Sequence, residues 1–368
     1  MYRILISKDV EEKAQTFSKT LFSERRADFV KPSQALIDFY DKIEVIEQGI
    51  SEVEKKDVLK NFKEYIKNLA MIFERIVDLH PREYDWYQEH FFSMVKKKQF
   101  SYRCRYGEKK DSFYMLIVED CLRYSCARDE FISFVEDSNI QSCVYCNMHS
   151  LESCSGSSGN FATYQLDHFK DKRDFPFLGI NFYNMVPSCS YCNQKKSKNE
   201  VPFFLYRLNE SEMENPFKFI FPKGFSAYFT EQKRENINYE FDVSTWYSYQ
   251  HESVFEIQSR YEARLDEIED FLKNLLMFVP ECMDLYKKSF PQLPYDAILQ
   301  ERINRLLKDK LNYSQVHEFS YTKIRLDLAQ ELNLIPRQTN VCSSSNTCDL
   351  LYKYFCANGF VKKIRKRK

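Results

Sequence analysis

The sequence predicts a mainly helical α+β fold, with a small cysteine-containing core between two helical regions. Only 7 of the 368 residues are glycine and 29% are charged, which together with long amphipathic runs is typical of helical chains. Between residues 139 and 205 the helical periodicity stops and two Cys-x-x-Cys pairs appear. We therefore divide the chain into an N-terminal helical region (1–138), this core (139–205) and a C-terminal region (206–368) of short strands, then helices and a basic tail.

The charge balance argues against a protein that coats nucleic acid along its whole surface. There are 54 Lys and Arg against 54 Asp and Glu, which leaves room for one local basic site. The first residues, MYRILISKDVEEK, carry charges where a signal peptide needs an apolar segment. No uncharged apolar run approaches the roughly 20 residues of a membrane span. We therefore expect a cytoplasmic protein with no membrane partner and with its 12 cysteines reduced.

The clearest predicted helix of the N-terminal region spans residues 51–80. Ser51 and Glu54 form a capping box, apolar side chains follow at i, i+3 and i+4 spacing, and Pro81 ends the pattern. Further helices are expected over 82–95 and 111–137. The segment between these two, KKKQFSYRCRYGEKK, interleaves basic and aromatic residues. It predicts either a surface that stacks bases and follows a nucleic-acid backbone, or an exposed loop between helices.

The C-terminal region is expected to begin with short strands and to continue as helices. Residues 216–243 alternate in FKFIF, SAYFT and NYEFDV, which favours strands. Apolar spacing then predicts a helix that stops at Pro280 and another that starts from a cap at Ser320. The tail, Lys362 to Lys368, is expected to be disordered or to attract nucleic acid non-specifically.

Two cysteine pairs at metal-ligand spacing predict a structural zinc site. The four proposed ligands are Cys143, Cys146, Cys189 and Cys192. Residues 147–188 separate the pairs, a gap that a zinc site tolerates if the enclosed segment folds and returns to its start. Four protein ligands leave no open position, so Zn²⁺ here would be structural. His149 and Cys154 are nearby substitutes, and unpaired core cysteines are the alternative to any metal site.

The enclosed segment contains groups suited to cutting a phosphodiester. YQLDHF, residues 164–169, is predicted to be a strand that ends near Asp167 and His168. Neighbouring strand residues point to opposite sides, so one can bind a metal while the other accepts a proton from water. Asn193, directly after the last zinc cysteine, adds a neutral oxygen, and hard oxygen ligands suit Mg²⁺.

The order Cys-x-x-Cys, strand, Asp-His, loop, Asn, Cys-x-x-Cys-Asn resembles the HNH (ββα-metal) endonucleases, in the branch with a four-cysteine zinc. The resemblance covers about residues 139–205. It implies that Asp167 and Asn193 bind a catalytic Mg²⁺ or Mn²⁺, that His168 is the general base, and that Asn184 pins the loop and orients the histidine. It also implies products with 5′-phosphate and 3′-hydroxyl ends. Asn193 would take the place of the final histidine of the family name.

The stretch LDHF…YNMVPSCSYCN is also similar to bacterial HNH proteins encoded beside an ATPase, such as the nuclease subunit of the Septu anti-phage system. This likeness implies a role in antiviral defence and an ATPase partner. Basic residues around the site are expected to contact the nucleic-acid substrate, with DNA favoured: Lys170, Lys172, Arg173, Lys195, Lys196 and Lys198. The rival hypothesis is a non-catalytic, zinc-stabilised adaptor that binds nucleic acid or an ATPase, because the flanking regions far exceed what catalysis by such a core needs.

Overall fold

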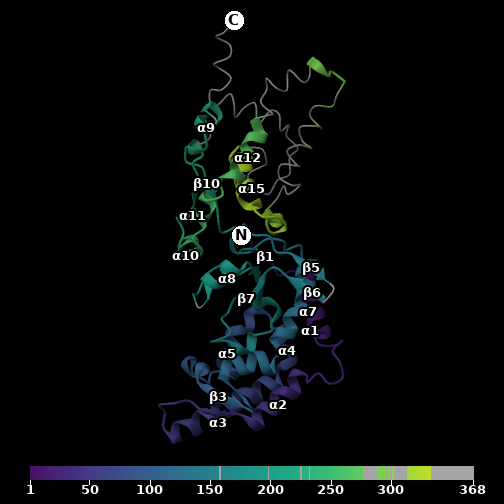
Figure 1. Ribbon diagram of the computed structural model, residues 1–368, viewed down its shortest axis with the longest axis vertical. Helices are drawn as coiled ribbons and strands as arrows, with labels where there is room; N and C mark the ends of the chain where they lie inside the picture. Colours follow the sequence, from purple (N-terminus) through teal and green to yellow (C-terminus); the bar gives the residue numbers. More distant parts are fainter. Residues whose placement is uncertain are drawn as a thin grey trace.

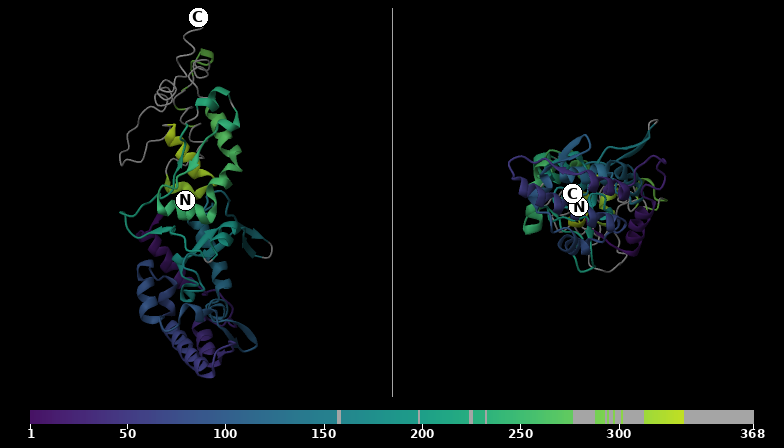
Figure 2. Two further views of the ribbon diagram at one scale, coloured as in Figure 1. Left: turned by 90° about the vertical axis from the view of Figure 1, so that its left-hand side faces the viewer. Right: turned by 90° about the horizontal axis from the view of Figure 1, so that it is seen from below.

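The three regions follow one another along an elongated molecule (Figures 1 and 2). The N-terminal helices form one end, the cysteine-containing core lies in the middle and the C-terminal helices form the other end. The computed structural model describes residues 1–156, 159–197, 199–223, 226–231, 233–276, 288–292, 294, 297, 301 and 313–332.

The N-terminal region is a group of helices with one small sheet. Its helices are α1 (Lys8–Thr20), α2 (Pro32–Lys42), α3 (Glu52–Met71), α4 (Phe73–Val77), α5 (Tyr84–Phe91), α6 (Phe113–Met115), α7 (Tyr124–Asp137), the 3₁₀ turns η1 (Pro81–Glu83) and η2 (Lys97–Ser101), and the π-helix η3 (Leu116–Cys121). The antiparallel sheet contains β2 (Glu44–Val45), β3 (Arg103–Tyr106) and β4 (Lys109–Ser112). This region supplies α7, which reaches the functional site.

The predicted N-terminal helices are present but are more interrupted than the periodicity indicated. The cap at Ser51 is confirmed, since its hydroxyl accepts the Glu54 N–H at 3.1 Å. The expected 51–80 helix divides at Ile72, and the 82–95 helix is shorter than expected. The expected 111–137 helix is broken before α7 because Arg123 adopts a left-handed conformation, with φ of 58°.

The basic and aromatic segment 96–110 forms η2 and the β3–β4 hairpin, rather than a loop. Phe100 is buried, and Tyr102 and Tyr106 pack against the hydrophobic core. Phe100 is therefore inside the protein and does not stack on bases, while Tyr102 and Tyr106 are partly buried and base stacking by them stays a prediction.

The middle region contains two strand pairs and one short helix. Its elements are β5 (Ser153–Gly156), β6 (Gly159–Ala162), β7 (Gln165–His168), the 3₁₀ turns η4 (Pro176–Leu178) and η5 (Phe182–Asn184), β8 (Met185–Ser188) and α8 (Ser190–Lys196). β7 pairs antiparallel with β8, with Asp167 opposite Val186 and His168 opposite Met185. The strand expected at 164–169 is thus confirmed, and it belongs to a β–β–α unit.

The C-terminal region mixes very short strands with helices. Its elements are β9 (Tyr206–Arg207), β10 (Phe219–Ile220), α9 (Ser226–Glu231), η6 (Arg234–Asn236), β11 (Glu240–Phe241), α10 (Trp246–Phe255), α11 (Ile257–Glu262), α12 (Leu265–Leu276), the 3₁₀ turn η7 (Tyr313–Glu318) and α15 (Thr322–Glu331). SAYFT is helical, so that strand prediction was wrong. The helix after Ser320 begins at a left-handed Tyr321 with no side-chain cap. Pro280 and the basic tail lie outside the described residues.

The three regions share one continuous hydrophobic core. The N-terminal strand β1 (Ile4–Leu5) pairs parallel with β9, which ties the start of the chain to the C-terminal region. Among the described residues, no helix is both long enough and apolar enough to cross a membrane.

Candidate functional site

The four cysteines of the two Cys-x-x-Cys pairs meet in one buried cluster. Their sulfur atoms all lie within 4.8 Å of one another, which is the arrangement of a site that could hold a metal ion such as zinc. Cys189 caps the N-terminus of α8 and Cys192 lies in its first turn, while the other pair comes from the turn before β5. The proposed substitutes, His149 and Cys154, are not part of the cluster.

Hydrogen bonds to sulfur support a thiolate cluster. The Cys189 N–H points at Cys143 Sγ at 3.3 Å, and the Cys192 N–H points at Cys189 Sγ at 3.5 Å. Arg260 donates from Nη1 to Cys192 Sγ at 3.4 Å, and its guanidinium lies over the Tyr191 ring, 4.2 Å from the centroid. A cation beside four sulfurs offsets part of the negative charge that a four-thiolate zinc site carries.

The turn that bears the first cysteine pair also forms a hydrogen bond to Asp167, the candidate active-site carboxylate. Tyr145 lies between the two cysteines, is buried, and donates its hydroxyl to Asp167 Oδ2 at 2.6 Å. Two hydrogen bonds from the C-terminal region stabilise this turn. His251 donates to the Tyr145 carbonyl at 2.7 Å, and Tyr261 donates to the Cys146 carbonyl at 2.9 Å. The cysteine cluster and Asp167 are therefore mechanically linked through one tyrosine.

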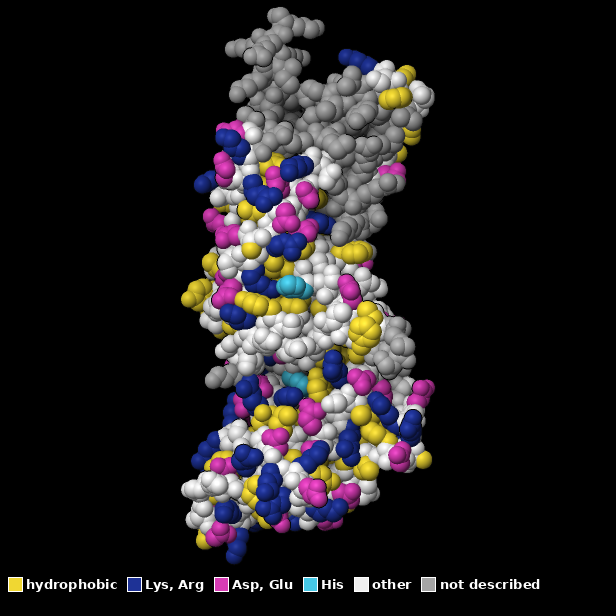
Figure 3. All heavy atoms as spheres, viewed as in Figure 1, with side chains coloured by type: hydrophobic (Ala, Val, Ile, Leu, Met, Phe, Trp, Pro, Cys, Tyr) yellow, Lys and Arg dark blue, Asp and Glu magenta, His cyan; other side chains and the backbone are white. Residues whose placement is uncertain are grey.

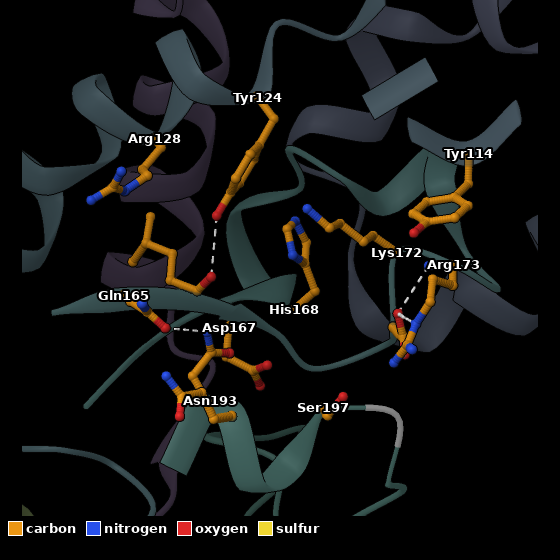
Figure 4. A pocket seen from close by; sticks show the side chains of 13 residues that line it. Tyr114, Tyr124, Arg128, Gln165, Asp167, His168, Lys172, Arg173, Asn193 and Ser197 are labelled. Atoms are coloured by element: carbon orange, nitrogen blue, oxygen red, sulfur yellow. Dashed lines mark hydrogen bonds and ion pairs between the residues drawn. The ribbon is translucent and has the colours of Figure 1, made fainter. Parts of the chain in front are cut away.

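A cavity of about 520 Å³ lies beside this link. Its walls are formed by Tyr114, Tyr124, Arg128, Gln165, Leu166, Asp167, His168, Asp171, Lys172, Arg173, Asn193, Gln194 and Ser197. Figure 4 shows α7 above the β7 strand and α8 below it, with His168 directed to the upper side and Asp167 to the lower side. The structure thus brings together Asp167, His168 and Asn193, the three residues that the motif singled out for chemistry.

His168 is a buried, neutral imidazole with one nitrogen committed to the backbone. Burial lowers its pKa to about 4. Its Nε2 lies 2.8 Å from the Gly179 carbonyl oxygen, which can only accept, so Nε2 carries the proton and Nδ1 carries the lone pair. The ring lies against Tyr124, with centroids 4.8 Å apart. Nδ1 has no hydrogen-bond partner among the described residues, as a proton acceptor for a substrate water requires.

Asp167 is almost completely buried and is held by two donors. Besides Tyr145, Lys196 approaches it, with Nζ at 3.0 Å from Oδ2 and 3.3 Å from Oδ1. Burial raises the pKa of Asp167, while the Lys196 ammonium and the Tyr145 hydroxyl act in the opposite direction. Lys196 also donates to the His168 carbonyl at 2.8 Å, so one ammonium ties both residues of the Asp-His pair to α8.

Asn184 is fully buried and fastens the loop between β7 and β8. Its side chain accepts the Lys170 N–H at 2.7 Å and donates to the carbonyls of Lys170 and Leu178, each at 3.1 Å. Leu178 directly precedes Gly179, whose carbonyl holds His168. Asn184 therefore bonds to the loop that orients the histidine, while the described hydrogen bond of the imidazole is to Gly179 and not to Asn184.

Asn193 lines the same cavity from α8. Its amide nitrogen donates to Gln165 Oε1, which leaves the amide oxygen without a hydrogen-bond partner among the described residues. Gln165 and Asp167 are two residues apart on β7 and so lie on one face of the strand. Asn193 is thereby placed on the side of the strand that carries the carboxylate.

The basic residues expected to contact nucleic acid occupy different positions. Lys172 and Arg173 line the cavity, although each also pairs with an acid, Glu119 and Asp171. Lys170 lies over the Phe175 ring. The placement of these side chains keeps positive charge beside the Asp-His pair.

Of the lysines that follow Cys192, the two that the structure describes, Lys195 and Lys196, do not share one surface. Lys195 is exposed and pairs with Glu256 at 3.1 Å, and it is not among the cavity residues. Lys196 is buried against Asp167, so the expectation that it meets a phosphate at the surface does not fit its position. Lys198 lies outside the described residues. On the face drawn in Figure 3, acidic and basic side chains are interspersed.

Arg128 is the functional candidate that the sequence did not single out. It lies on α7, four residues after Tyr124, and lines the cavity from above β7 (Figure 4). No described residue forms a hydrogen bond or ion pair with its guanidinium. The signal available in the sequence was the i, i+4 spacing of Tyr124 and Arg128 on a predicted helix, but only the fold brings that helix against the Asp-His strand.

The donor set beside β7 has the chemistry of a site for a hard divalent cation. Asp167 offers carboxylate oxygens and Asn193 an amide oxygen, the ligand types that Mg²⁺ and Mn²⁺ prefer. A carboxylate oxygen has lone pairs beyond the one that Tyr145 uses. The feature that competes with such an ion is the Lys196 ammonium, which already contacts both oxygens.

Comparison with protein-family models, with curated proteins and with solved structures found no match for this chain. The resemblance to HNH endonucleases therefore rests on the sequence motif of residues 139–205.

Proposed function

We propose that the protein is a metal-dependent endonuclease of the HNH type, with DNA as the favoured substrate. The observation that carries this proposal is the convergence of Asp167, His168 and Asn193 on one cavity, beside a four-cysteine cluster. A phosphodiesterase needs a proton acceptor, anionic or polar oxygens for a cation, and positive charge for the phosphate. All three kinds of group line this cavity.

His168 is the general base in this account. Its Nε2 proton is held by the Gly179 carbonyl, which fixes the ring and leaves Nδ1 to accept the proton of the attacking water. Asn184 keeps that carbonyl in place through the loop that it fastens. Such a base contributes roughly 10²–10⁴-fold to a reaction.

Asp167 and Asn193 would hold Mg²⁺ or Mn²⁺, which supplies charge stabilisation for the 3′-oxygen leaving group when bound. Arg128 and Lys172 are positioned to bind the non-bridging phosphate oxygens, because both line the cavity next to the Asp-His strand. The zinc cluster is structural: it holds α8 and the Tyr145 turn, and through them Asn193 and Asp167.

A non-catalytic adaptor explains the cluster but not the cavity. Such a protein has no need for an imidazole, a carboxylate and an amide oxygen that line one cavity together with an arginine that pairs with no described residue. The resemblance to ATPase-linked HNH proteins further suggests an antiviral role with an ATPase partner, and we include this partner in the proposal.

The test is cleavage of supercoiled plasmid by the zinc-loaded chain in Mg²⁺ or Mn²⁺, alone and after copurification with its cellular partners. We expect nicked or linear DNA, loss of cleavage in EDTA, and a fall of at least about 10²-fold for His168→Ala. An Arg128→Ala variant should weaken DNA binding, whereas His168→Ala should not. DNA binding without cleavage under every condition would instead favour the adaptor.

A further inference from the structure

The buried lysine of α8 contacts both carboxylate oxygens of Asp167, the residue that we propose as a metal ligand. Lys196 is 2% exposed, and its ammonium is surrounded by three oxygens, Asp167 Oδ1 and Oδ2 and the His168 carbonyl, at 3.3, 3.0 and 2.8 Å. Its neighbour Lys195 points away to Glu256. Two adjacent lysines on one short helix therefore have different surroundings.

This arrangement is a cation site filled by a side chain. In the described part of the chain, Lys196 is the cation that forms an ion pair with Asp167, while Tyr145 contributes a neutral hydroxyl. A buried ammonium is stable only when it is paired and hydrogen-bonded, and a buried carboxylate has the same requirement. Each of the two groups thus stabilises the other in the absence of another ion.

We propose that Lys196 is a built-in cation that a divalent metal must displace from Asp167. The inference rests on the proposed metal-dependent reaction, and concerns how that reaction is restrained. Two cations at one carboxylate repel each other strongly in a poorly solvated site. The four-carbon stem of lysine is flexible, so the ammonium can leave while the helix stays in place.

Displacement has a consequence for the substrate. A Lys196 ammonium displaced from Asp167 would stay close to the cavity, which Asp167 itself lines together with Lys172, Arg173 and Arg128. A phosphodiester bound there would interact with the released ammonium, because phosphate oxygens accept from lysine. Metal binding and preparation of the phosphate site are then coupled through one side chain.

The first test is Mn²⁺ binding to the zinc-loaded full chain, measured as free Mn²⁺ by electron paramagnetic resonance. Lys196→Met keeps the stem and removes the charge, and we expect it to bind Mn²⁺ at least about tenfold more tightly than the wild type. Lys195→Met is the matched control and should bind as the wild type does. Equal or weaker binding by a zinc-retaining Lys196→Met protein would overturn the proposal.

A second measurement needs no variant and decides the matter if Lys196→Met fails to fold. Reductive methylation of the wild-type chain, mapped by mass spectrometry, reports how accessible each lysine is. Lys196 should be protected without a divalent ion and should be modified several-fold more in Mg²⁺, while Lys195 is modified equally in both conditions. Protection of Lys196 that Mg²⁺ leaves unchanged would rule out displacement.

Asp167→Asn separates this proposal from the proposed function. Mn²⁺ binding that Asp167→Asn abolishes, but that Lys196→Met does not alter, would refute displacement and leave the nuclease assignment standing. If Mn²⁺ binding is indifferent to Asp167 in every variant, both the displacement and the metal site assigned to this carboxylate are wrong.

Discussion

At the scale of single residues, Tyr145 connects the cysteine cluster to the candidate metal ligand Asp167. It lies between two cysteines of the cluster, and its hydroxyl holds Asp167 at 2.6 Å. The turn that carries two cysteines of the cluster thereby sets the position of the carboxylate that we assign to the catalytic metal. Because the hydrogen bond is buried and its acceptor is a carboxylate, it belongs to the stronger class of protein hydrogen bonds.

Tyr145→Phe should remove this bond without changing the packing of the ring. We expect a loss of about 1.5–3 kcal/mol in the free energy of unfolding, the range for hydrogen bonds to charged groups, with zinc content unchanged. Urea denaturation provides the measurement. Tyr191→Phe is the control, since the Tyr191 hydroxyl bonds to Glu256 at the surface, and its stability should stay within about 0.5 kcal/mol of wild type. Equal losses in the two variants would show that the Tyr145–Asp167 bond has no special role.

Asn184→Ala tests how the loop that orients His168 is held. The side chain makes three hydrogen bonds to the loop backbone, and at roughly 1 kcal/mol each their loss should cost about 3 kcal/mol in the free energy of unfolding. Limited proteolysis should then cut between residues 169 and 184 faster than in the wild type. A variant with wild-type stability and wild-type proteolysis would contradict the role assigned to Asn184.

The sequence could predict the chemistry-bearing residues better than their partners. Spacing identified the four cysteines, because metal ligands impose short, regular intervals. The order of the motif singled out Asp167, His168 and Asn193, which line one cavity and whose roles stay predictions. Tyr145 and Arg128 act through contacts made across the fold, and local spacing carries no information about such contacts. Lys196 was misread as a surface residue for the same reason: its burial depends on the strand packed above it.

At the scale of elements, the short helix α8 is where the two sites meet. Cys189 caps it, Cys192 follows in its first turn, Asn193 faces the cavity and Lys196 closes its last turn against Asp167. A helix of this length is not stable by itself in water. Its geometry therefore depends on the sulfur cluster at its start and on the ion pair at its end.

Cys189→Ser should abolish both zinc binding and the native fold, because a zinc site of this kind forms only in the folded chain and contributes its binding energy to folding. Metal analysis should find one zinc per chain in the wild type and none in the variant, and the variant should show no cooperative thermal transition. Cys154→Ser, at a free cysteine outside the cluster, should retain both the zinc and the transition. A Cys189→Ser protein with full zinc and an unchanged melting temperature would refute the four-cysteine site.

Element prediction succeeded where periodicity is strong and failed where tertiary contacts decide. The capped helix at Ser51 and the strand that carries Asp167 were expected and are present. The break before α7 depends on a left-handed Arg123, and SAYFT forms a helix although it alternates like a strand. Short alternating segments satisfy both patterns, so local sequence does not choose between them.

At the scale of the whole molecule, the C-terminal region acts as a clamp on the cysteine turn. Asn147, just after the second cysteine, is buried and donates to the carbonyls of Val316 and Phe319 at 2.7 and 3.0 Å. Its side-chain oxygen accepts the Lys323 N–H at 2.8 Å. The His251 hydrogen bond and the shared hydrophobic core add to these contacts. The segment 139–205 is therefore packed against its flanking regions and does not have a separate core.

We therefore expect a single cooperative unfolding transition. Helix content, followed by circular dichroism, and zinc release, followed with a colorimetric chelator, should share one midpoint in urea, because the cluster and the helices belong to one core. Zinc released at a clearly lower urea concentration than helix loss would show that the core segment unfolds by itself, and would contradict the clamp.

Chemical rescue of His168→Gly tests the central claim most directly. The variant removes the imidazole and leaves space for a free one, so the account predicts that Mg²⁺-dependent plasmid cleavage falls by at least about 10²-fold and is partly restored by added imidazole. Imidazole should not restore Asp167→Asn, whose defect lies in metal binding. Wild-type cleavage by His168→Gly without imidazole, or a wild-type protein that never cuts DNA with metal and partner present, would contradict the account.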